Sequence, residues 1–402
     1  MQSIFASDRC LKVVIATVLA LLGIAVPSAR AASYTGTVLY PCTMPSGFTG
    51  YGALQAAAGQ TVGGGGTGTN GHALLWSGPV GSIIDLNPTS LTGISYSVAE
   101  GTNGTQQVGY GEGSGTGNNA HALLWSGTAA SAVDLQPTSL TEITNSYAMG
   151  TSGTQQVGYG YGSGTGNNNH ALLWSGTAAS AVDLNPTNLG GFTYSESRGT
   201  SGTQQAGDGG TGSIDHALLW SGTAASAVDL NPTNLGGFTY SEANGTNGTQ
   251  QVGDGYGSGT GDNHHALLWS GTAASAVDLN PTNLTGFDIS VALATNGAQQ
   301  VGDGAGSATG GSSHALLWSG TADSAVDLQL LLPSNGTWIH SLACGIDGAG
   351  NVYGLAAGTL NGVTGPFAVE WSPVPEPASL GLLALAGGML LMRRTRQGGE
   401  VL

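Results

Sequence analysis

A short tract that recurs at a nearly constant interval limits the folds open to this chain. The tract HALLWSG begins at six histidines: His72, His121, His170, His216, His265 and His314. The intervals are 49, 49, 46, 49 and 49 residues, and a fixed period of this size is typical of repeat architectures. A residue present in every repeat is expected to serve the scaffold, because catalysis normally needs a unique constellation.

Each repeat unit contains four short apolar tracts. In residues 216–264 these are HALLW, AVDL, FTYSEA and QQVGDG, separated by Gly, Asn, Pro or Ser clusters. Such tracts are typical of strands, and four strands in about 45–50 residues make one blade of a β-propeller. Both faces of HALLW are apolar, which favours a sheet packed between two neighbouring sheets.

The two ends of the repeat region together supply a seventh blade. The Val-Gly type of tract occurs seven times, and PFAVEW, ending at Trp371, takes the place of a seventh HALLW. No Asp-Leu tract follows Trp371, whereas TVLYP near the N-terminus resembles AVDLNP. We therefore expect residues 35–40 to pair with residues 366–372. The predicted fold is all-β, a β-propeller of seven four-stranded blades over residues 32–373. A β-solenoid is the alternative, and it would not need this closure.

Charge is unevenly distributed along the chain. Residues 32–373 contain 20 acidic residues and one basic residue, Arg198, which gives a formal charge of −19. Nucleic-acid binding needs Lys and Arg to neutralise phosphates, so we exclude nucleic acid as a partner.

The N-terminal residues 1–31 read as a secretory signal. Arg9 and Lys12 precede an apolar stretch, and Ala29-Arg30-Ala31 has the pattern of a signal-peptidase site, with Ala29 and Ala31 as the small residues. We expect signal peptidase to remove this segment and the body to be exported.

The C-terminal residues 374–397 have the order of a sorting signal. Pro375, Glu376 and Pro377 precede an uncharged stretch over 378–392, and the basic residues Arg393, Arg394 and Arg396 follow. These elements resemble the PEP-CTERM signal of Gram-negative bacteria, with residues 398–402 as a short tail. The resemblance implies a transient transmembrane anchor, processing by exosortase, and delivery to the cell surface or extracellular matrix. It also implies an association with exopolysaccharide and biofilm.

The repeat units themselves resemble the HAF repeats of secreted bacterial proteins. They keep His, Ala, Leu and Trp, the Asp-Leu tract, the Ser-Glu-Ala tract at 241–243 and the Val-Gly tract. They depart from that pattern in having Leu for Phe, and Asn-Pro or Gln-Pro after Asp-Leu. The resemblance implies an extracellular propeller-like fold without an established activity.

The repeated polar residues are expected to be structural. We predict that each His is hydrogen-bonded within its blade, each Trp is buried between blades, and each Asp is a turn or strand-end acceptor. No nucleophile set or metal motif occurs, so we predict no enzyme activity and no cofactor. Calcium remains an alternative in the loop 253–263, which carries Asp254 and Asp262. We expect the Gly-rich connections to be flexible solvated loops, and one of them, between Ala206 and Trp220, is three residues shorter than its equivalents.

Two sets of residues are candidates for special roles. Cys42 and Cys344 are candidates for a disulfide, because export permits one. Tyr110, Tyr161 and Tyr256 are candidates for glycan contacts in equivalent Gly-rich loops. We expect a structural or adhesive surface protein that binds polysaccharide or surface proteins. The alternatives are a lectin-like propeller and, third, a propeller glycosidase or lyase. The third would require paired carboxylates unique to one or two blades.

Overall fold

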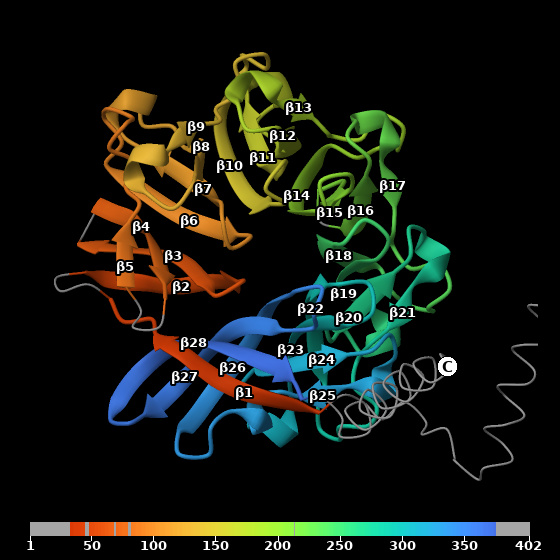
Figure 1. The fold of residues 1–402 in the computed structure, drawn as a ribbon. Coiled ribbons are helices and arrows are strands. Elements are labelled where there is room, and N and C mark those ends of the chain that lie inside the picture. Colours follow the sequence, from red (N-terminus) through yellow and green to blue (C-terminus); the bar gives the residue numbers. More distant parts are fainter. Residues whose placement is uncertain (1–32, 45–47, 68–69, 79–81, 213, 375–402) are drawn as a thin grey trace, which may run out of the picture. The chain divides into compact units, whose positions relative to one another are not determined.

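Seven antiparallel four-stranded sheets surround a central axis in the computed structural model (Figure 1). The structure describes residues 33–44, 48–67, 70–78, 82–212 and 214–374, and Tyr34–Pro373 form one compact unit. The predicted seven-bladed propeller is confirmed, and the β-solenoid alternative is wrong. Within these described ranges, no helix is long and apolar enough to cross a membrane.

The sheets are numbered here as blades in chain order, and the first strand of blades 1–6 lies nearest the axis (Figure 1). Blade 1 comprises β2 (Thr49–Ala57), β3 (Gln60–Thr67), β4 (Asn70–Ser77) and β5 (Ser82–Asp85). Blade 2 comprises β6 (Tyr96–Thr102), β7 (Gln107–Glu112), β8 (His121–Trp125) and β9 (Val133–Asp134). Blade 3 comprises β10 (Ile143–Thr151), β11 (Gln156–Gly162), β12 (His170–Trp174) and β13 (Val182–Asp183). Blade 4 comprises β14 (Tyr194–Thr200), β15 (Gln205–Gly210), β16 (Asp215–Trp220) and β17 (Val228–Asp229). Blade 5 comprises β18 (Tyr240–Thr246), β19 (Gln251–Tyr256), β20 (His265–Trp269) and β21 (Val277–Asp278). Blade 6 comprises β22 (Ile289–Thr295), β23 (Gln300–Ala305), β24 (His314–Trp318) and β25 (Val326–Asp327). Blade 7 comprises β26 (Thr337–Ile346), β27 (Val352–Leu360), β28 (Val363–Pro373) and β1 (Tyr34–Pro41).

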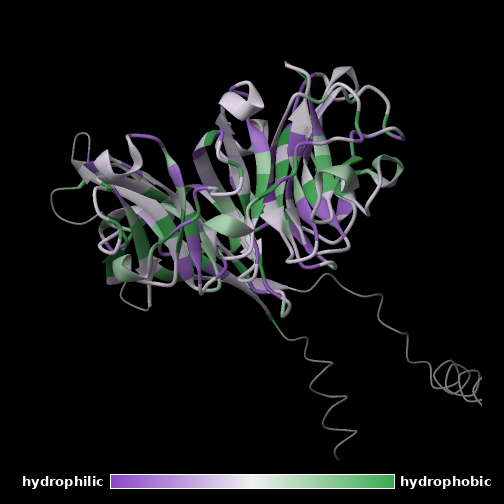
Figure 2. Ribbon diagram, turned by 90° about the horizontal axis from the view of Figure 1, so that it is seen from above, coloured by the Kyte–Doolittle hydropathy of each residue, from purple (hydrophilic) through white to green (hydrophobic). Residues whose placement is uncertain are grey.

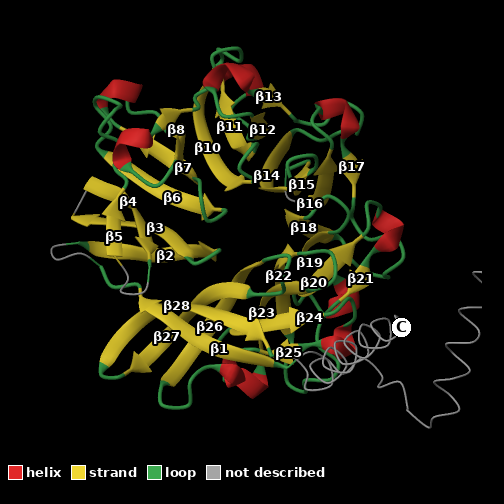
Figure 3. Ribbon diagram, in the orientation of Figure 1, coloured by secondary structure: helices red, strands yellow, loops and turns green. Residues whose placement is uncertain are grey.

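Short 3₁₀ helices occupy the connections between strands (Figure 3). Those that follow the second strand of a blade are η1 (Ser114–Thr116), η3 (Ser163–Thr165), η6 (Ser258–Thr260) and η8 (Ser307–Thr309). Those that follow the third strand are η2 (Ala129–Ser131), η4 (Ala178–Ser180), η5 (Ala224–Ser226), η7 (Ala273–Ser275) and η9 (Ala322–Ser324), and η10 (Gln329–Leu331) precedes blade 7. Four of the Gly-rich connections, which we expected as flexible solvated loops, each contain one such 3₁₀ turn. In η1, the Thr116 hydroxyl donates to Gly113 O and accepts from Gly113 N, both at 3.1 Å, which fixes the turn.

The ring closes through the two ends of the unit. β1 pairs antiparallel with β28 from Tyr34↔Pro373 to Pro41↔Phe367, as the sequence predicted. The hydroxyl of Tyr40 in β1 then reaches blade 1, where it donates to Trp76 O at 3.1 Å. The pairing covers the edge of β28, which would otherwise be open to other chains.

The predicted disulfide between Cys42 and Cys344 is wrong, because both cysteines are free and buried. Cys42 follows β1 at one edge of blade 7, whereas Cys344 lies in β26 at the opposite edge. Three strand spacings separate these edges by roughly 14 Å, and a disulfide requires Cα atoms within about 7 Å.

The core consists of layers between blades. Val62 and Leu75 of blade 1 pack against Leu123 and Trp125 of blade 2, while Leu124, next along the same strand, faces blade 3. Hydrophobic residues accordingly concentrate in the strands, and the connections are largely neutral or hydrophilic (Figure 2). Every repeated Trp is 0% exposed, which confirms the predicted burial. Replacing a buried Trp by Ala typically costs about 3–5 kcal/mol, so these residues hold the blades together.

Candidate functional site

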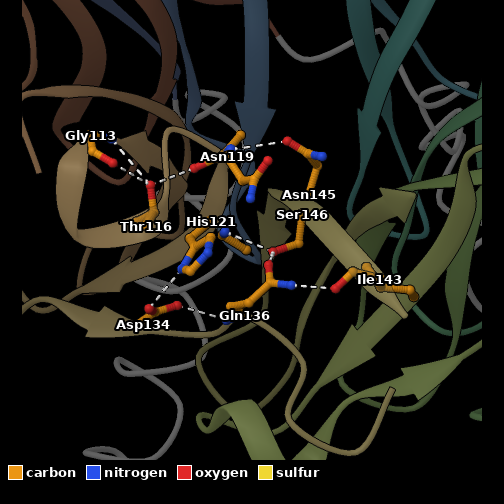
Figure 4. Close-up of polar contacts among 11 residues, drawn as sticks. Gly113, Thr116, Asn119, His121, Asp134, Gln136, Ile143, Asn145 and Ser146 are labelled. Atoms are coloured by element: carbon orange, nitrogen blue, oxygen red, sulfur yellow. Dashed lines mark hydrogen bonds and ion pairs between the residues drawn. The ribbon is translucent and has the colours of Figure 1, made fainter. Parts of the chain in front are cut away.

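The repeated His and Asp residues form one pair in each of six blades, of which Figure 4 shows the pair His121 and Asp134 in blade 2. In blade 2, His121 Nδ1 lies 2.9 Å from Asp134 Oδ2, and the other five pairs lie at 2.7–2.8 Å. Asp134 Oδ1 also accepts a hydrogen bond from Gln136 N at 2.8 Å, which closes a turn after the strand. The predicted structural roles of the repeated His and Asp are confirmed.

A serine of the inner strand in blades 2–7 joins that blade to the preceding one. Ser146 in β10 accepts a hydrogen bond from Ala122 N of blade 2 at 2.9 Å and donates to Gln136 Oε1 at 2.6 Å (Figure 4). Equivalent serines accept from the N–H of the Ala after the repeated His and donate to the Asn or Gln after Asp-Leu; they are Ser97, Ser195, Ser241, Ser290 and Ser341. The Asn-Pro or Gln-Pro departure from the HAF pattern thus provides an interblade acceptor.

The Gln-Gln tract makes a second interblade link, which sequence reasoning missed. Gln155 Oε1 of blade 3 accepts from Thr200 Oγ1 at 3.2 Å and from Gln205 Nε2 at 2.9 Å, both in blade 4. The same arrangement joins each consecutive pair from blade 1 to blade 6. The repeated polar residues therefore serve the scaffold, and a functional site must be sought where the repeats differ.

The repeats differ most in the inner strands, at the residue directly after each interblade serine and at its equivalent in blade 1. In each blade, this residue of the inner strand pairs with a residue of the second strand. These cross-strand pairs are Gly52↔Gly64, Val98↔Tyr110, Tyr147↔Tyr159, Glu196↔Asp208, Glu242↔Asp254, Val291↔Asp303 and Leu342↔Leu355. We call these pairs in blades 2–5 the axial site, because the inner strands surround the axis. The axial site also includes the neighbouring residues Tyr161, Arg198, Asp215, Tyr240, Tyr256 and His264.

Tyrosines form the part of the axial site in blades 2 and 3. The ring of Tyr147 lies 4.8 Å from Tyr110, 4.9 Å from Tyr159 and 6.4 Å from Tyr161, measured between centroids. These separations are typical of interacting aromatic rings. Burial raises the pKa of Tyr159 to about 12, and the carboxylates of Glu196 and Glu100 add to that effect. The tyrosines therefore lie within electrostatic reach of the acidic residues in blade 4.

Carboxylates and Arg198 form the part of the axial site in blades 4 and 5. Arg198 Nε donates to Asp208 Oδ1 at 2.7 Å. The Nη2 atom of Arg198 lies 3.5 Å from Glu242 Oε2 and 3.8 Å from Glu196 Oε2. Like charges directly opposed across a strand pair are destabilising, so the Glu196↔Asp208 and Glu242↔Asp254 pairs oppose folding. Departures from local stability of this kind are expected at functional sites.

Burial and crowding shift the acid chemistry of this cluster. Burial raises the pKa of Asp208 to about 7, against the opposing effect of Arg198, and Glu242 adds to the increase. Burial alone would lower the pKa of Arg198, but its carboxylate neighbours, Asp208 first, raise it. In blade 5, the hydrogen bond from His264 Nδ1 to Asp254 Oδ2 at 2.7 Å raises the histidine pKa.

The short connection in blade 4 lies beside this cluster. The described residues of the connection after β15 form no 3₁₀ helix, unlike its equivalents in blades 2, 3, 5 and 6, and β16 begins early, at Asp215. Oxygens of Asp208, Asp215 and Glu242 lie within 4.8 Å of one another. Asp215 Oδ1 is buried and has no hydrogen-bond partner. The body's single basic residue and its shortened connection thus occur at one place.

The candidate calcium loop has a different arrangement. Asp254 lies inside β19, where its carboxylate contacts His264 and, at 3.3 Å, Asn244 Nδ2. Asp262 follows η6 with a φ of +62°, in a turn. In the described ranges, the carboxylates that converge closely enough for a metal are instead those of Asp208, Asp215 and Glu242, beside the Arg198 guanidinium.

The candidate glycan residues lie in strands and not in loops, which corrects the prediction. Tyr110, Tyr161 and Tyr256 belong to β7, β11 and β19 respectively, and each is partly exposed. Their positions are also not equivalent, because Tyr110 aligns with Tyr159, whereas Tyr161 aligns with Tyr256. Tyr110 and Tyr161 meet around Tyr147, and Tyr256 stacks on Tyr240 at 4.5 Å. The signal-cleavage residues Ala29 and Ala31 and the sorting residues Pro375 to Arg396 lie outside the described residues.

A cavity of about 380 Å³ lies where the inner strands end. Its lining is mostly Thr, Gly and Ala from these strands, together with Arg198, Asn244 and Cys344. The lining threonines Thr102, Thr151, Thr200, Thr246 and Thr295 already donate to glutamines of preceding blades. Arg198 links this cavity to the axial site.

The chain has distant similarity to several solved structures. No family model matches the chain, and no curated protein matches it. Among solved structures, it is similar to a putative TolB from Agrobacterium tumefaciens, with 9% identity over 61% of this chain and 88% of that chain and a TM-score of 0.38. It is also similar to prolyl oligopeptidase B from Galerina marginata, with 10% identity over 86% of this chain and 50% of that chain and a TM-score of 0.48. An oligogalacturonate lyase in complex with manganese has 7% identity over 86% of this chain and 99% of that chain, with a TM-score of 0.46.

Proposed function

We propose that this protein is an exported, exosortase-processed component of the cell surface or extracellular matrix that binds polysaccharide through its axial site. The observation that carries the binding role is the convergence of Tyr110, Tyr147, Tyr159 and Tyr161 on partly exposed positions of two neighbouring blades. Aromatic side chains offer large apolar faces with a polar hydroxyl, which suits the C–H faces and hydroxyls of sugars. The terminal signals described above support the export and sorting part of the proposal.

The binding role is tested by removing the aromatic face while keeping the fold. Tyr147→Ala should reduce binding of the full-length protein to matrix polysaccharide at least tenfold, whereas Tyr147→Phe, which keeps the ring, should bind nearly normally. The triple replacement of Tyr110, Tyr161 and Tyr256 by Ala should also lose binding. Unchanged binding by the Ala variants would refute the axial site as the binding surface.

Export and sorting are tested by cell fractionation. We expect the protein in the matrix fraction of cells with exosortase, and a membrane-retained, uncleaved form in cells without it. Equal distribution in both strains would contradict the sorting proposal.

A glycosidase is a second candidate, favoured by one observation. Blades 4 and 5 contain the paired carboxylates that such an enzyme needs, since Asp208 and Glu242 have oxygens within 4.8 Å. The ion pair of the buried Asp208 with Arg198 favours binding over catalysis. Release of reducing ends from matrix polysaccharide, abolished by Glu242→Gln, would establish the enzyme and replace the binding proposal.

A further inference from the structure

The acidic part of the axial site has more negative charge than its own cation can neutralise. Glu196, Asp208 and Glu242 contact one guanidinium, that of Arg198, and Asp215 lies beside Asp208 and Glu242. Counted as formal charges, four carboxylates against one cation leave −3, and −2 if Asp208 holds a proton. The cluster is also only partly shielded, since the side chains of Glu196 and Glu242 are 24% and 21% exposed.

One buried acceptor in this cluster has no partner. Asp215 Oδ1 is inaccessible to solvent and makes no hydrogen bond among the described residues. A buried polar atom left without a partner costs about 1–3 kcal/mol, so a donor from a ligand would be stabilising there. Asp215 lies at the start of β16, directly before His216, as His264 lies directly before His265 in blade 5.

The acidic residues are also continuous with aromatic rings. The Tyr240 hydroxyl contacts Glu242, and its ring stacks on Tyr256 at 4.5 Å. On the other side, Glu196 is close enough to Tyr159 to influence its titration. A ligand that suits this arrangement presents a flat apolar face to the tyrosines and a cationic donor to the carboxylates.

We propose that the axial site binds the ammonium groups of an amino-sugar polysaccharide, with Glu242 and Asp215 as acceptors and the neighbouring tyrosines as the stacking surface. An ammonium has three donors and no acceptor, which matches a cluster composed of acceptors. N-acetylation of the amine would remove both the charge and two of its donors. This inference rests on the proposed polysaccharide binding and names the chemical class of that ligand.

The test is calorimetric titration of the full-length protein with two hexasaccharides, one of glucosamine and one of N-acetylglucosamine. We expect the glucosamine hexamer to bind at least tenfold more tightly. Glu242→Gln should weaken its binding at least tenfold and leave the weak binding of the acetylated hexamer unchanged. Asp323→Asn is the matched control, because it removes an acid in η9 away from the axial site and should not change either affinity.

Two results would overturn the inference while leaving polysaccharide binding intact. The first is equal affinity for both hexamers, with both lost in Tyr147→Ala. The second is binding of neither hexamer by a protein that still binds matrix polysaccharide through its tyrosines. Spermine that binds as tightly as the glucosamine hexamer, with the same dependence on Glu242, would show recognition of charge alone and would also overturn it. Glu196→Gln provides a second acidic variant if Glu242→Gln does not fold, and it should weaken binding of the glucosamine hexamer in the same direction.

Discussion

Replacement of Ser195 by Ala should destabilise the propeller through one buried interblade link. Ser195 is 0% exposed; its hydroxyl accepts from Ala171 N at 3.1 Å and donates to Asn185 Oδ1 at 2.9 Å. Asn185 is partly exposed and can bond water instead, whereas Ala171 is 0% exposed and its N–H would have no partner. A buried donor left unsatisfied costs about 1–3 kcal/mol, so we expect a loss of about 2 kcal/mol in the free energy of unfolding.

Ser180→Ala, in η4 of the preceding blade 3, is the matched control. Its hydroxyl also makes two hydrogen bonds, from Ser175 N at 2.8 Å and to Thr177 O at 2.6 Å, but it is partly exposed. Water can replace those bonds, so we expect a loss below about 0.5 kcal/mol. Urea unfolding followed by the fluorescence of the buried tryptophans measures both variants. Equal losses for Ser195→Ala and Ser180→Ala would refute the reasoning that burial of the link sets its value.

Three further predictions concern other buried groups. Trp371→Phe should cost about 1 kcal/mol more than Trp174→Phe in urea unfolding, because Trp371 Nε1 donates to a backbone carbonyl at 2.8 Å and Trp174 Nε1 has no partner; equal costs would contradict this. Cys42 and Cys344 should not react with a thiol reagent at pH 8 in the native protein, because burial raises the pKa of each to about 12, and both should react after denaturation without a reductant. A disulfide detected by non-reducing mass mapping would contradict the second result. Because the pKa of Asp208 rises from 3.8 to about 7 on folding, its contribution to stability is present below pH 4 and is lost as the pH rises through about 7. Asp208→Asn should therefore show a weaker decline in stability than the wild type in urea titrations between pH 4.5 and 7.5, and parallel declines would be evidence against the shift.

The positions of the repeated tracts predicted most of the fold, because they show which strands the two ends of the repeat region must supply. The pairing of β1 with β28 followed from a missing Asp-Leu tract after Trp371 and a matching tract near the N-terminus. The buried Trp residues followed from the apolar character of both faces of HALLW. The HALLW pattern occurs six times, so an error in one copy could not change the second outcome.

The axial site could not be predicted in the same way, because it depends on which residues meet across blades. Tyr147 of blade 3 meets Tyr110 of blade 2, and Arg198 of blade 4 meets Glu242 of blade 5, so these contacts depend on how two blades pack. Tyr110 was placed in the wrong register because similar Tyr-Gly tracts occur at two positions of the second strand. Substitutions among the inner-strand tracts, such as Glu196 where another repeat has Tyr147, were the signal that could have identified the site.

Because blade 7 is assembled from β1 and β26–β28, the number of blades can change without damage to the closure. The intervening units are nearly identical in sequence and mostly 49 residues long. Unequal recombination between two of them would add or remove one complete blade and leave both halves of the closing blade in place. The chain is thus built so that ring size can evolve by exchange of whole units, while the distinctive residues of blades 4 and 5 are the part that such an exchange would erase.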